Sequence, residues 1–473
     1  MKKLLLTIVA MLLSTAASAL RPYGDHNSWT YNAATHTLTI HKTSEGYMYG
    51  YSSMNGDDVA FFADTPWANY LTDIRTVIIE SGVTSIGGAA FRGCTNLTSV
   101  TIPNSVQYIE SYAFSGCSSL SSINIPEGVE SIYWGAFENC TSLTSITIPK
   151  SVKHIYSSIE CSAFSGCSGL TSIKVESGNP VFDSRNNCNA IIEQSDKTDN
   201  VNVFLVAGCK NTVIPNDVRV INGYAFSGCS GLTSITIPNG VRFMCAGAFQ
   251  GCSGLSSISI PKSVTEIQRD MFNGCAGLTS ITIEGSDFSI GLGAFLNCSK
   301  LTDIYFTGLD DDGFTIKRHN YYQLGIVPDD YSNITVHVPS AFQNSYPNYF
   351  FENGNSNYGF KDLKTLDGSS IPKCEKPVIS FTNGKLSFTC ATPNVEFHWT
   401  ITSANGEDGS GVSSEVSPSF KIRVYAGKSG CVNSDIETRV LDCNTGGLKG
   451  DLDGDGKVNV ADHVKLSDII LGK

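Results

Sequence analysis

The sequence predicts a β-rich solenoid of about 23-residue coils, followed by a small β-sandwich and a tail made of an acidic loop and a helix. The main observation is a phrase, Ala-Phe-x-Gly/Asn-Cys with small changes, that occurs eight times in the 473 residues. Its phenylalanine, mostly repeating every 23 residues, stands at Phe91, Phe114, Phe137, Phe164, Phe226, Phe249, Phe272 and Phe295. A fixed period in this range is typical of proteins in which each repeat is one coil stacked on the last.

Each coil begins with a short strand. From Ser99 to Ile102, polar and β-branched apolar residues alternate, which indicates a strand with one buried face. Pro103 ends the strand, because proline has no N–H for the ladder. The outward strand positions are polar and almost uncharged: Ser99/Thr101, Ser122/Asn124, Ser145/Thr147, Ser172/Lys174, Ser234/Thr236, Ser257/Ser259, Ser280/Thr282 and Asp303/Tyr305. This face is either a solvated sheet surface or a hydrogen-bonding platform for a protein or glycan.

The rest of the coil completes the core. Val106 and Ile109 form the next inward pair, Ala113 and Phe114 fill the interior, and Gly116 turns the chain into the next coil. One coil cannot bury its own apolar edge, whereas a stack of coils can. The pattern therefore predicts a continuous core that runs through all the repeats.

Eight of the sixteen cysteines occupy one fixed position of this repeat. They are Cys94, Cys117, Cys140, Cys167, Cys229, Cys252, Cys275 and Cys298. Coils joined by sheet pairing lie about 4.8 Å apart with parallel side chains, which holds the Cβ atoms too far apart for an ordinary disulfide. One ligand per coil also fails to gather four ligands around a metal. We therefore expect buried free thiols that act as small apolar side chains.

The start of the chain has the pattern of a secretory signal peptide. Met1-Lys2-Lys3 is followed by an apolar run from Leu4 to Leu13 and by Ala17-Ser18-Ala19, which predicts a signal peptide over residues 1–19. The run is too short to span a bilayer, and no other long apolar stretch follows, so we expect an exported chain without a transmembrane segment. A formal net charge of −12 with 16% charged residues gives no basic surface for nucleic acid.

Aromatic residues appear at variable repeat positions: Tyr108, Tyr112, Tyr133, Trp134, Tyr156, Tyr224 and Phe243. Exposed aromatic side chains anchor protein or sugar partners, but single ones are also ordinary surface. Tyr108, Tyr133 and Trp134 lie on adjacent coils and are the candidate ligand-binding residues.

The repeat resembles the BspA-like leucine-rich repeat family of bacterial surface proteins over roughly residues 20–370. The residues that carry the likeness are Ser85-Ile86-Gly87, Ala90-Phe91-Arg92-Gly93-Cys94 and Leu97-Thr98-Ser99-Val100-Thr101-Ile102-Pro103. Trp29-Thr30-Tyr31 and Ile334–Pro339 are similar to the family's two caps, and residues 178–192 are similar to its longer variant coil. The resemblance implies adhesion to a host protein or glycan, and it fixes no ligand-binding residues.

Residues 372–443 alternate like short strands separated by turn residues, which predicts a small β-sandwich similar to fibronectin-type or immunoglobulin-like spacers. Its four cysteines, Cys374, Cys390, Cys431 and Cys443, allow three pairings as two disulfides, and the sequence does not choose among them.

Residues 447–473 contain the sharpest chemical motif, a calcium-type loop. Oxygen donors stand at loop positions 1, 3, 5, 9 and 12, Gly456 stands at position 6, and position 7 offers a main-chain carbonyl. The predicted calcium ligands are Asp451, Asp453, Asp455, Lys457 through its backbone carbonyl, Asn459 and Asp462. A helix with Val464, Leu466 and Ile469 follows. The segment resembles one half of a dockerin, which implies docking to a cohesin-like scaffold, although a dockerin normally has two such repeats.

No catalytic constellation accompanies these features. Gly427-Lys428-Ser429 lacks the first glycine of a P-loop, since Ile422 stands there, and neither G-x-S-x-G nor H-E-x-x-H occurs. We therefore expect a secreted or cell-surface binding protein rather than an enzyme. The alternatives are a dockerin-recruited member of a polysaccharide-processing complex and a structural surface-layer protein.

Overall fold

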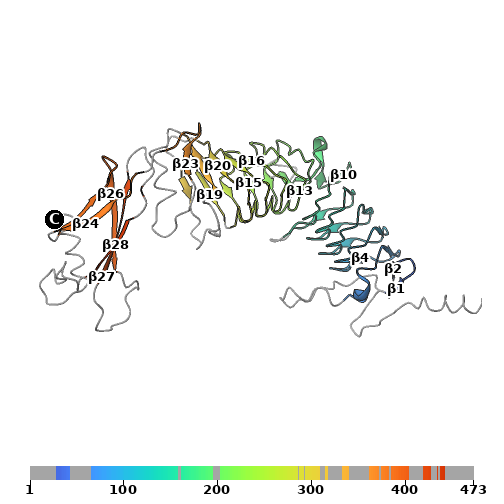
Figure 1. The fold of residues 1–473 in the computed structure, drawn as a ribbon. Coiled ribbons are helices and arrows are strands. Elements are labelled where there is room, and N and C mark those ends of the chain that lie inside the picture. Colours follow the sequence, from blue (N-terminus) through green and yellow to red (C-terminus); the bar gives the residue numbers. More distant parts are fainter. Residues whose placement is uncertain are drawn as a thin grey trace, which may run out of the picture. The chain divides into compact units, whose positions relative to one another are not determined.

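The computed structural model describes residues 28–42, 65–157, 161–194, 203–285, 287–291, 293–308, 315–317, 333–339, 362–371, 374–382, 385–403, 419–427, 434 and 437–442 (Figure 1). The chain divides into two compact units. The first comprises residues 1–308 and 315–329, and the second comprises residues 309–314 and 330–473.

The first unit is a solenoid whose coils stack through a ladder of parallel strands (Figure 1). An antiparallel hairpin of β1 (Ser28–Asn32) and β2 (Thr37–His41) starts it, and β2 pairs in parallel with the first repeat strand. The repeat strands are β3 (Thr76–Ile79), β5 (Ser99–Thr101), β8 (Ser145–Ile148), β10 (Ser172–Val175), β16 (Ser257–Ile260), β18 (Ser280–Ile283) and β20 (Asp303–Phe306). Residues 122–125 and 234–237 carry the same alternation but form no strand. The alternating segments thus become the expected ladder in most coils.

A second parallel ladder runs along another side of the coils. In the first half it consists of β4 (Ser85–Ile86), β6 (Tyr108–Ile109), β7 (Ser131–Ile132) and β9 (His154–Ile155). Farther along lie β14 (Val220–Ile221), β15 (Phe243–Met244), β17 (Glu266–Ile267), β19 (Asp287–Ile290) and β21 (Thr315–Lys317). Most of these strands have only two residues, of which the second points inward; Ile109 and Ile132, for example, are fully buried. The sequence predicts the inward residue but not the strand.

The repeated phrase forms the third side of the coil. Phe91 N–H donates to the Ala113 carbonyl at 2.8 Å, and Phe114 N–H donates to the Ala136 carbonyl at the same distance. Gly116 has a φ of 75°, a left-handed conformation that favours glycine. The phenylalanine rings are buried and stacked, with centroids 5.3 Å apart for Phe91–Phe114, 5.6 Å for Phe114–Phe137 and Phe137–Phe164, 5.0 Å for Phe226–Phe249, 5.7 Å for Phe249–Phe272 and 5.8 Å for Phe272–Phe295. The predicted core positions are confirmed.

The long interval between Phe164 and Phe226 is an expanded coil. It contains β11 (Phe182–Asp183), the short 3-10 turn η2 (Arg185–Asn187), β12 (Ala190–Gln194) and β13 (Val203–Gly208). β11, β12 and β13 pair antiparallel, and β13 then pairs in parallel with β14, which returns the chain to the solenoid. The Phe226 ring packs directly against the main chain at Gly208. Gly208 thus takes the place beside Phe226 that a phenylalanine ring fills in the regular coils.

Gly208 therefore tolerates no side chain. We expect Gly208→Ala to lower the free energy of unfolding by about 1–3 kcal/mol, because its Cβ would overlap the buried Phe226 ring. Gly285→Ala is the matched control, since its nearest neighbour is 3.7 Å away and the new methyl group meets only ordinary contacts. Denaturant unfolding monitored by circular dichroism measures both variants, and equal stability of the two would contradict the packing at Gly208.

The described secondary-structure elements of the second unit are all β-strands (Figure 1). β22 (Thr335–Val338) pairs in parallel with β23 (Asp362–Thr365). β24 (Val378–Thr382) and β25 (Lys385–Thr389) form one antiparallel sheet, and β26 (Glu396–Ser403), β27 (Ser419–Gly427) and β28 (Glu437–Asp442) form another. The Phe388 and Phe397 ring centroids lie 5.8 Å apart and join the two sheets. This arrangement is compatible with the predicted sandwich over residues 372–443, which stays a prediction.

Cys390 carries a free thiol that donates to the Glu375 carbonyl at 3.0 Å, so it takes part in neither of the two disulfides that the four cysteines allow. Cys431 and Cys443 lie outside the described residues.

Helices are nearly absent from the described ranges, which contain only η2 and a second 3-10 turn, η1 (Ala68–Tyr70). In this part of the chain, no helix is long and apolar enough to cross a membrane. The predicted signal peptide over residues 1–19 and the predicted helix after Asp462 lie outside the described residues.

Candidate functional site

The two strand ladders expose different side chains. On the ladder that begins at β3, the outward residues Ser99, Thr101, Ser145 and Thr147 are exposed, while the inward Ile146 and Ile148 are buried. Strand register places equivalent hydroxyl groups next to one another on successive coils, as for Ser257 beside Ser280. This surface is polar and weakly charged, as the sequence predicts.

The other ladder carries an aromatic patch on three successive coils. We define the aromatic patch by its residues: Tyr108, Glu110, Tyr112, Tyr133, Trp134, His154 and Tyr156. The residues align because β6, β7 and β9 are in register, with Tyr108 beside Ser131 and Ser131 beside His154. One position past the inward isoleucines, Glu110, Tyr133 and Tyr156 therefore form a column along the solenoid.

A row of three rings makes up one part of the aromatic patch. Tyr133 stacks on Tyr156 with centroids 4.8 Å apart and an angle of 27° between the rings. His154 stacks on Tyr156 at 5.7 Å. Tyr156 is 41% exposed. Tyr156 therefore links Tyr133 and His154 in one group of stacked rings.

A second part of the aromatic patch is held by contacts between coils. Tyr112 and Trp134 meet edge to face at 4.8 Å, and the Arg92 guanidinium carbon lies 4.8 Å from the Tyr112 ring centroid. Tyr112 has a φ of 59°, which is an uncommon and costly conformation for a bulky residue. Its ring lies over Gly135 of the next coil, where a Cβ would overlap it. These contacts fix the ring in place.

Burial affects the ionisable groups of the aromatic patch. Desolvation raises the pKa of the Glu110 carboxyl above its usual range. Desolvation also raises the pKa of Tyr133, with smaller contributions from nearby Glu110 and Tyr156. Burial likewise raises the pKa of Tyr112. Burial is the largest cause in each case, so these three groups are partly removed from water.

The predicted cluster of Tyr108, Tyr133 and Trp134 is found on adjacent coils, but its members do not form one contact group. Tyr133 stacks on Tyr156, whereas Trp134 turns to Tyr112. Sequence reasoning missed Glu110, His154 and Arg92 as members or neighbours of the surface. The available signal was the repeat column, since Glu110, Tyr133 and Tyr156 are each 23 residues apart.

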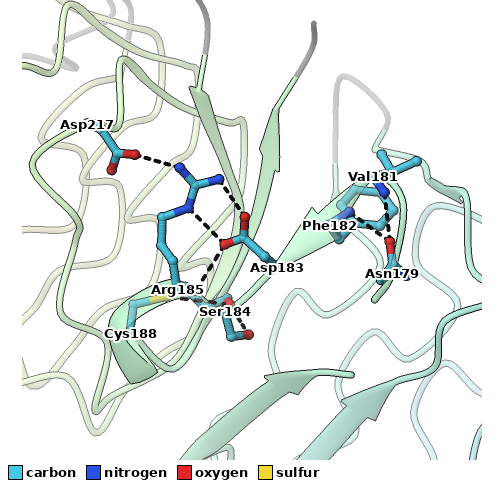
Figure 2. A network of polar contacts seen from close by, with 9 residues as sticks. Asn179, Val181, Phe182, Asp183, Ser184, Arg185, Cys188 and Asp217 are labelled. Atoms are coloured by element: carbon cyan, nitrogen blue, oxygen red, sulfur yellow. Dashed lines mark hydrogen bonds and ion pairs between the residues drawn. The ribbon is translucent and has the colours of Figure 1, made fainter. Parts of the chain in front are cut away.

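The expanded coil contains a separate polar network (Figure 2). Arg185 donates from Nε to Asp183 Oδ1 at 2.8 Å and from a terminal nitrogen to Asp217 Oδ2 at 2.5 Å, so it joins the hairpin to the next coil. Asn179 Oδ1 accepts the N–H groups of Val181 and Phe182 at 2.9 and 2.8 Å. Since the acidic groups are paired with arginine and the amide is paired with main chain, this network stabilises the coil.

The predicted calcium ligands lie outside the described residues, in the segment 451–462. Within the described ranges, no group of three or more His, Cys, Asp or Glu side chains is arranged to hold a metal ion. The calcium loop therefore stays a prediction from its donor spacing.

The fold and its surfaces define the class of protein. Stacked coils of about 23 residues, with parallel ladders and a buried phenylalanine and cysteine column, are a leucine-rich-repeat solenoid. The BspA type leucine rich repeat region matches residues 67–192 and 198–319 in six copies, which is more than half of the 473 residues. The chain belongs to this family. No curated protein matches the chain.

Several solved structures are similar in fold. A leucine-rich repeat protein from Eubacterium ventriosum is 22% identical, with a TM-score of 0.46 over 78% of this chain and 100% of its own. A leucine rich cell surface protein from Faecalibacterium prausnitzii is 23% identical, with a TM-score of 0.39 over 74% of this chain and 95% of its own. A leucine-rich repeat protein from Bacteroides ovatus is 20% identical, with a TM-score of 0.38 over 73% of this chain and 88% of its own.

Proposed function

We propose that this protein is exported to the cell surface or the medium and works as a binding or adhesion protein for a host or neighbouring-cell protein or glycan. The observation that carries the proposal is the aromatic patch, a concentration of partly exposed rings on three successive coils. Aromatic side chains supply large contact areas at low entropic cost, and they dominate binding energy at interfaces. A family whose members are typically cell-surface proteins supports the same role.

Arrays of host matrix proteins and glycans test this proposal. We expect a ligand whose affinity falls at least about tenfold in the double variant Tyr133→Ala/Tyr156→Ala, because both rings of one stack are removed. The control is Ser145→Ala/Thr147→Ala on the other ladder, which we expect to stay within about twofold of the unmodified chain. A loss of affinity in the control but not in the tyrosine variant would place the ligand on the ladder that carries Ser145 and Thr147. No ligand together with hydrolase activity would contradict the proposal.

We also propose that the tail binds one calcium ion. The donors of the loop are carboxylate, amide and main-chain oxygens, which are the ligands that calcium prefers. Calorimetric titration of the full chain should show one site, and Asp451→Ala or Asp462→Ala should weaken it at least about tenfold. Asp73→Asn, a change in an exposed aspartate of the solenoid, is the control and should leave the site intact. Unchanged calcium uptake in both tail variants would show that the loop is not the site.

The likeness of this loop to half a dockerin supports a second role, recruitment to a cohesin-like scaffold in a polysaccharide-processing complex. A pull-down that compares the full chain with a chain ending before Asp451 separates this role from adhesion. Recruitment predicts that a scaffold protein is lost with the tail, and an unchanged set of partners excludes it. Self-association without any other partner would instead indicate a structural surface-layer protein.

A further inference from the structure

The column Glu110–Tyr133–Tyr156 places a carboxylate beside a tyrosine ring that is stacked on one side only. Tyr133 N–H donates to the Ile109 carbonyl at 2.9 Å, which aligns Tyr133 with the residue that follows Ile109, namely Glu110. One face of the Tyr133 ring contacts Tyr156. The coil on the other side of Tyr133, the preceding one, carries Glu110 and Tyr108 on β6 and its flank.

Tyr108, Glu110 and Tyr133 together form a corner of the aromatic patch, and their side-chain polar groups have no partner in the described part of the chain. Within the described part of the chain, the Glu110 carboxylate forms no ion pair and no side-chain hydrogen bond, and the hydroxyl groups of Tyr108 and Tyr133 form no hydrogen bond. The nearby Lys153 pairs with Glu130 at 3.3 Å. Desolvating a carboxylate without a partner costs free energy, and a cation supplied from outside would recover that cost.

The neighbouring part of the aromatic patch shows how such a surface accommodates a cation. Arg92 lies over the Tyr112 ring at 4.8 Å, within the range of a cation–π interaction. The corner at Tyr133 has the same ring chemistry and adds a carboxylate, and among the described residues no lysine or arginine pairs with it.

We propose that the corner formed by Tyr108, Glu110 and Tyr133 binds a cationic side chain, lysine or arginine, of a partner polypeptide. The inference rests on the proposed binding function and names the chemistry of its site. The cation lies against the Tyr133 ring and forms an ion pair with the Glu110 carboxylate, and the tyrosine hydroxyl groups accept from its remaining N–H donors.

Fluorescence polarisation with a labelled lysine-rich peptide, and with the same peptide acetylated at every lysine, tests the site at physiological salt, where distant charges are screened. We expect the full chain to bind the cationic peptide at least about tenfold tighter than the acetylated one. Glu110→Gln should weaken the cationic peptide about tenfold, and Glu127→Gln, an equal charge change at an exposed position of the next coil, should leave it unchanged. Tyr133→Phe should keep most of the affinity and Tyr133→Leu should lose it, because only the former retains the ring.

The outcomes separate this inference from the proposed function. Equal weakening by Glu110→Gln and Glu127→Gln would mean nonspecific attraction to an acidic chain and would overturn the site. The site is also wrong if the Tyr133→Ala/Tyr156→Ala variant loses an array ligand while Glu110→Gln keeps it, and the binding function then stands. Binding of a neutral glycan at the aromatic patch, with no preference for the cationic peptide, would overturn the cation site in the same way. Thermal melts of each variant confirm that it is folded.

Discussion

Replacing Phe114 with alanine should lower the free energy of unfolding by about 3–5 kcal/mol. Its ring is fully buried and stacks on Phe91 at 5.3 Å and on Phe137 at 5.6 Å, so truncation leaves a cavity between two coils. The second ladder, through β4, β6 and β7, holds these coils at a fixed spacing, which hinders closure of the cavity. Chemical denaturation followed by circular dichroism measures the loss.

Phe243→Ala provides the matched control for this experiment. Phe243 is the same residue type in the same solenoid, but it is 62% exposed on β15. We expect its truncation to change stability by no more than about 0.5 kcal/mol. If Phe114→Ala costs no more than Phe243→Ala, the buried column does not carry the stability of the coils.

The loss of stability in Phe114→Ala should also be confined to the neighbouring coils. Each coil of a solenoid contacts only its neighbours, so its stability depends on nearest-neighbour interfaces. Hydrogen exchange in Phe114→Ala should therefore increase at amides of the coils that contain Phe91, Phe114 and Phe137, and much less near Phe272. A uniform increase over both halves would instead indicate one cooperative unit.

The repeated phrase is the reason that so much of the fold follows from the sequence. A residue type that returns every 23 positions on the chain must face the same way on every coil, so Phe114 and Cys117 could be assigned to the core without coordinates. The two-residue strands were not predictable, because a strand such as β6 is too short to show an alternation. Its existence depends on main-chain pairing with the neighbouring coil.

The aromatic patch was predictable only in part, for a different physical reason. The period places Tyr133 and Trp134 on one coil, but it does not say which neighbour each ring contacts. Trp134 contacts Tyr112 because Tyr112 adopts a left-handed backbone and Gly135 leaves room for its ring. Backbone conformation of this kind has no signature in a pattern of residue types, apart from the glycine that accommodates it.

The eight repeat cysteines should resist alkylation in the folded chain and react fully once it unfolds. Most of the thiols donate to the carbonyl of the phenylalanine in the preceding coil: Cys117 to Phe91 and Cys140 to Phe114 at 3.2 Å, Cys167 to Phe137 at 3.1 Å, Cys252 to Phe226 at 3.2 Å, Cys275 to Phe249 and Cys298 to Phe272 at 3.1 Å. The expectation of buried free thiols is confirmed for seven of the eight repeat cysteines, while Cys298 is a free thiol that is only partly buried. The hydrogen bond explains why a small polar sulfur is tolerated in the apolar column.

The protection has two sources that act in the same direction. Burial raises the pKa of the Cys94 and Cys140 thiols to about 12 from the ordinary value of 9.0. Because the thiolate is the nucleophile, three pKa units reduce the reactive fraction near pH 8 by about a thousandfold. Steric exclusion of the reagent lowers the rate further.

Iodoacetamide labelling at pH 8 with peptide mass spectrometry measures this protection, in buffer and in concentrated guanidinium chloride. We expect labelling of the repeat cysteines to be at least about a thousandfold slower in the native chain than in the unfolded chain. Cys390 lies outside the solenoid and is only partly buried, so it is the internal control that should label in both states. Fast native labelling of Cys140 or Cys252 would mean that the coils open on the timescale of the reaction. A disulfide between any two repeat cysteines in the non-reduced digest would contradict the parallel thiol column itself.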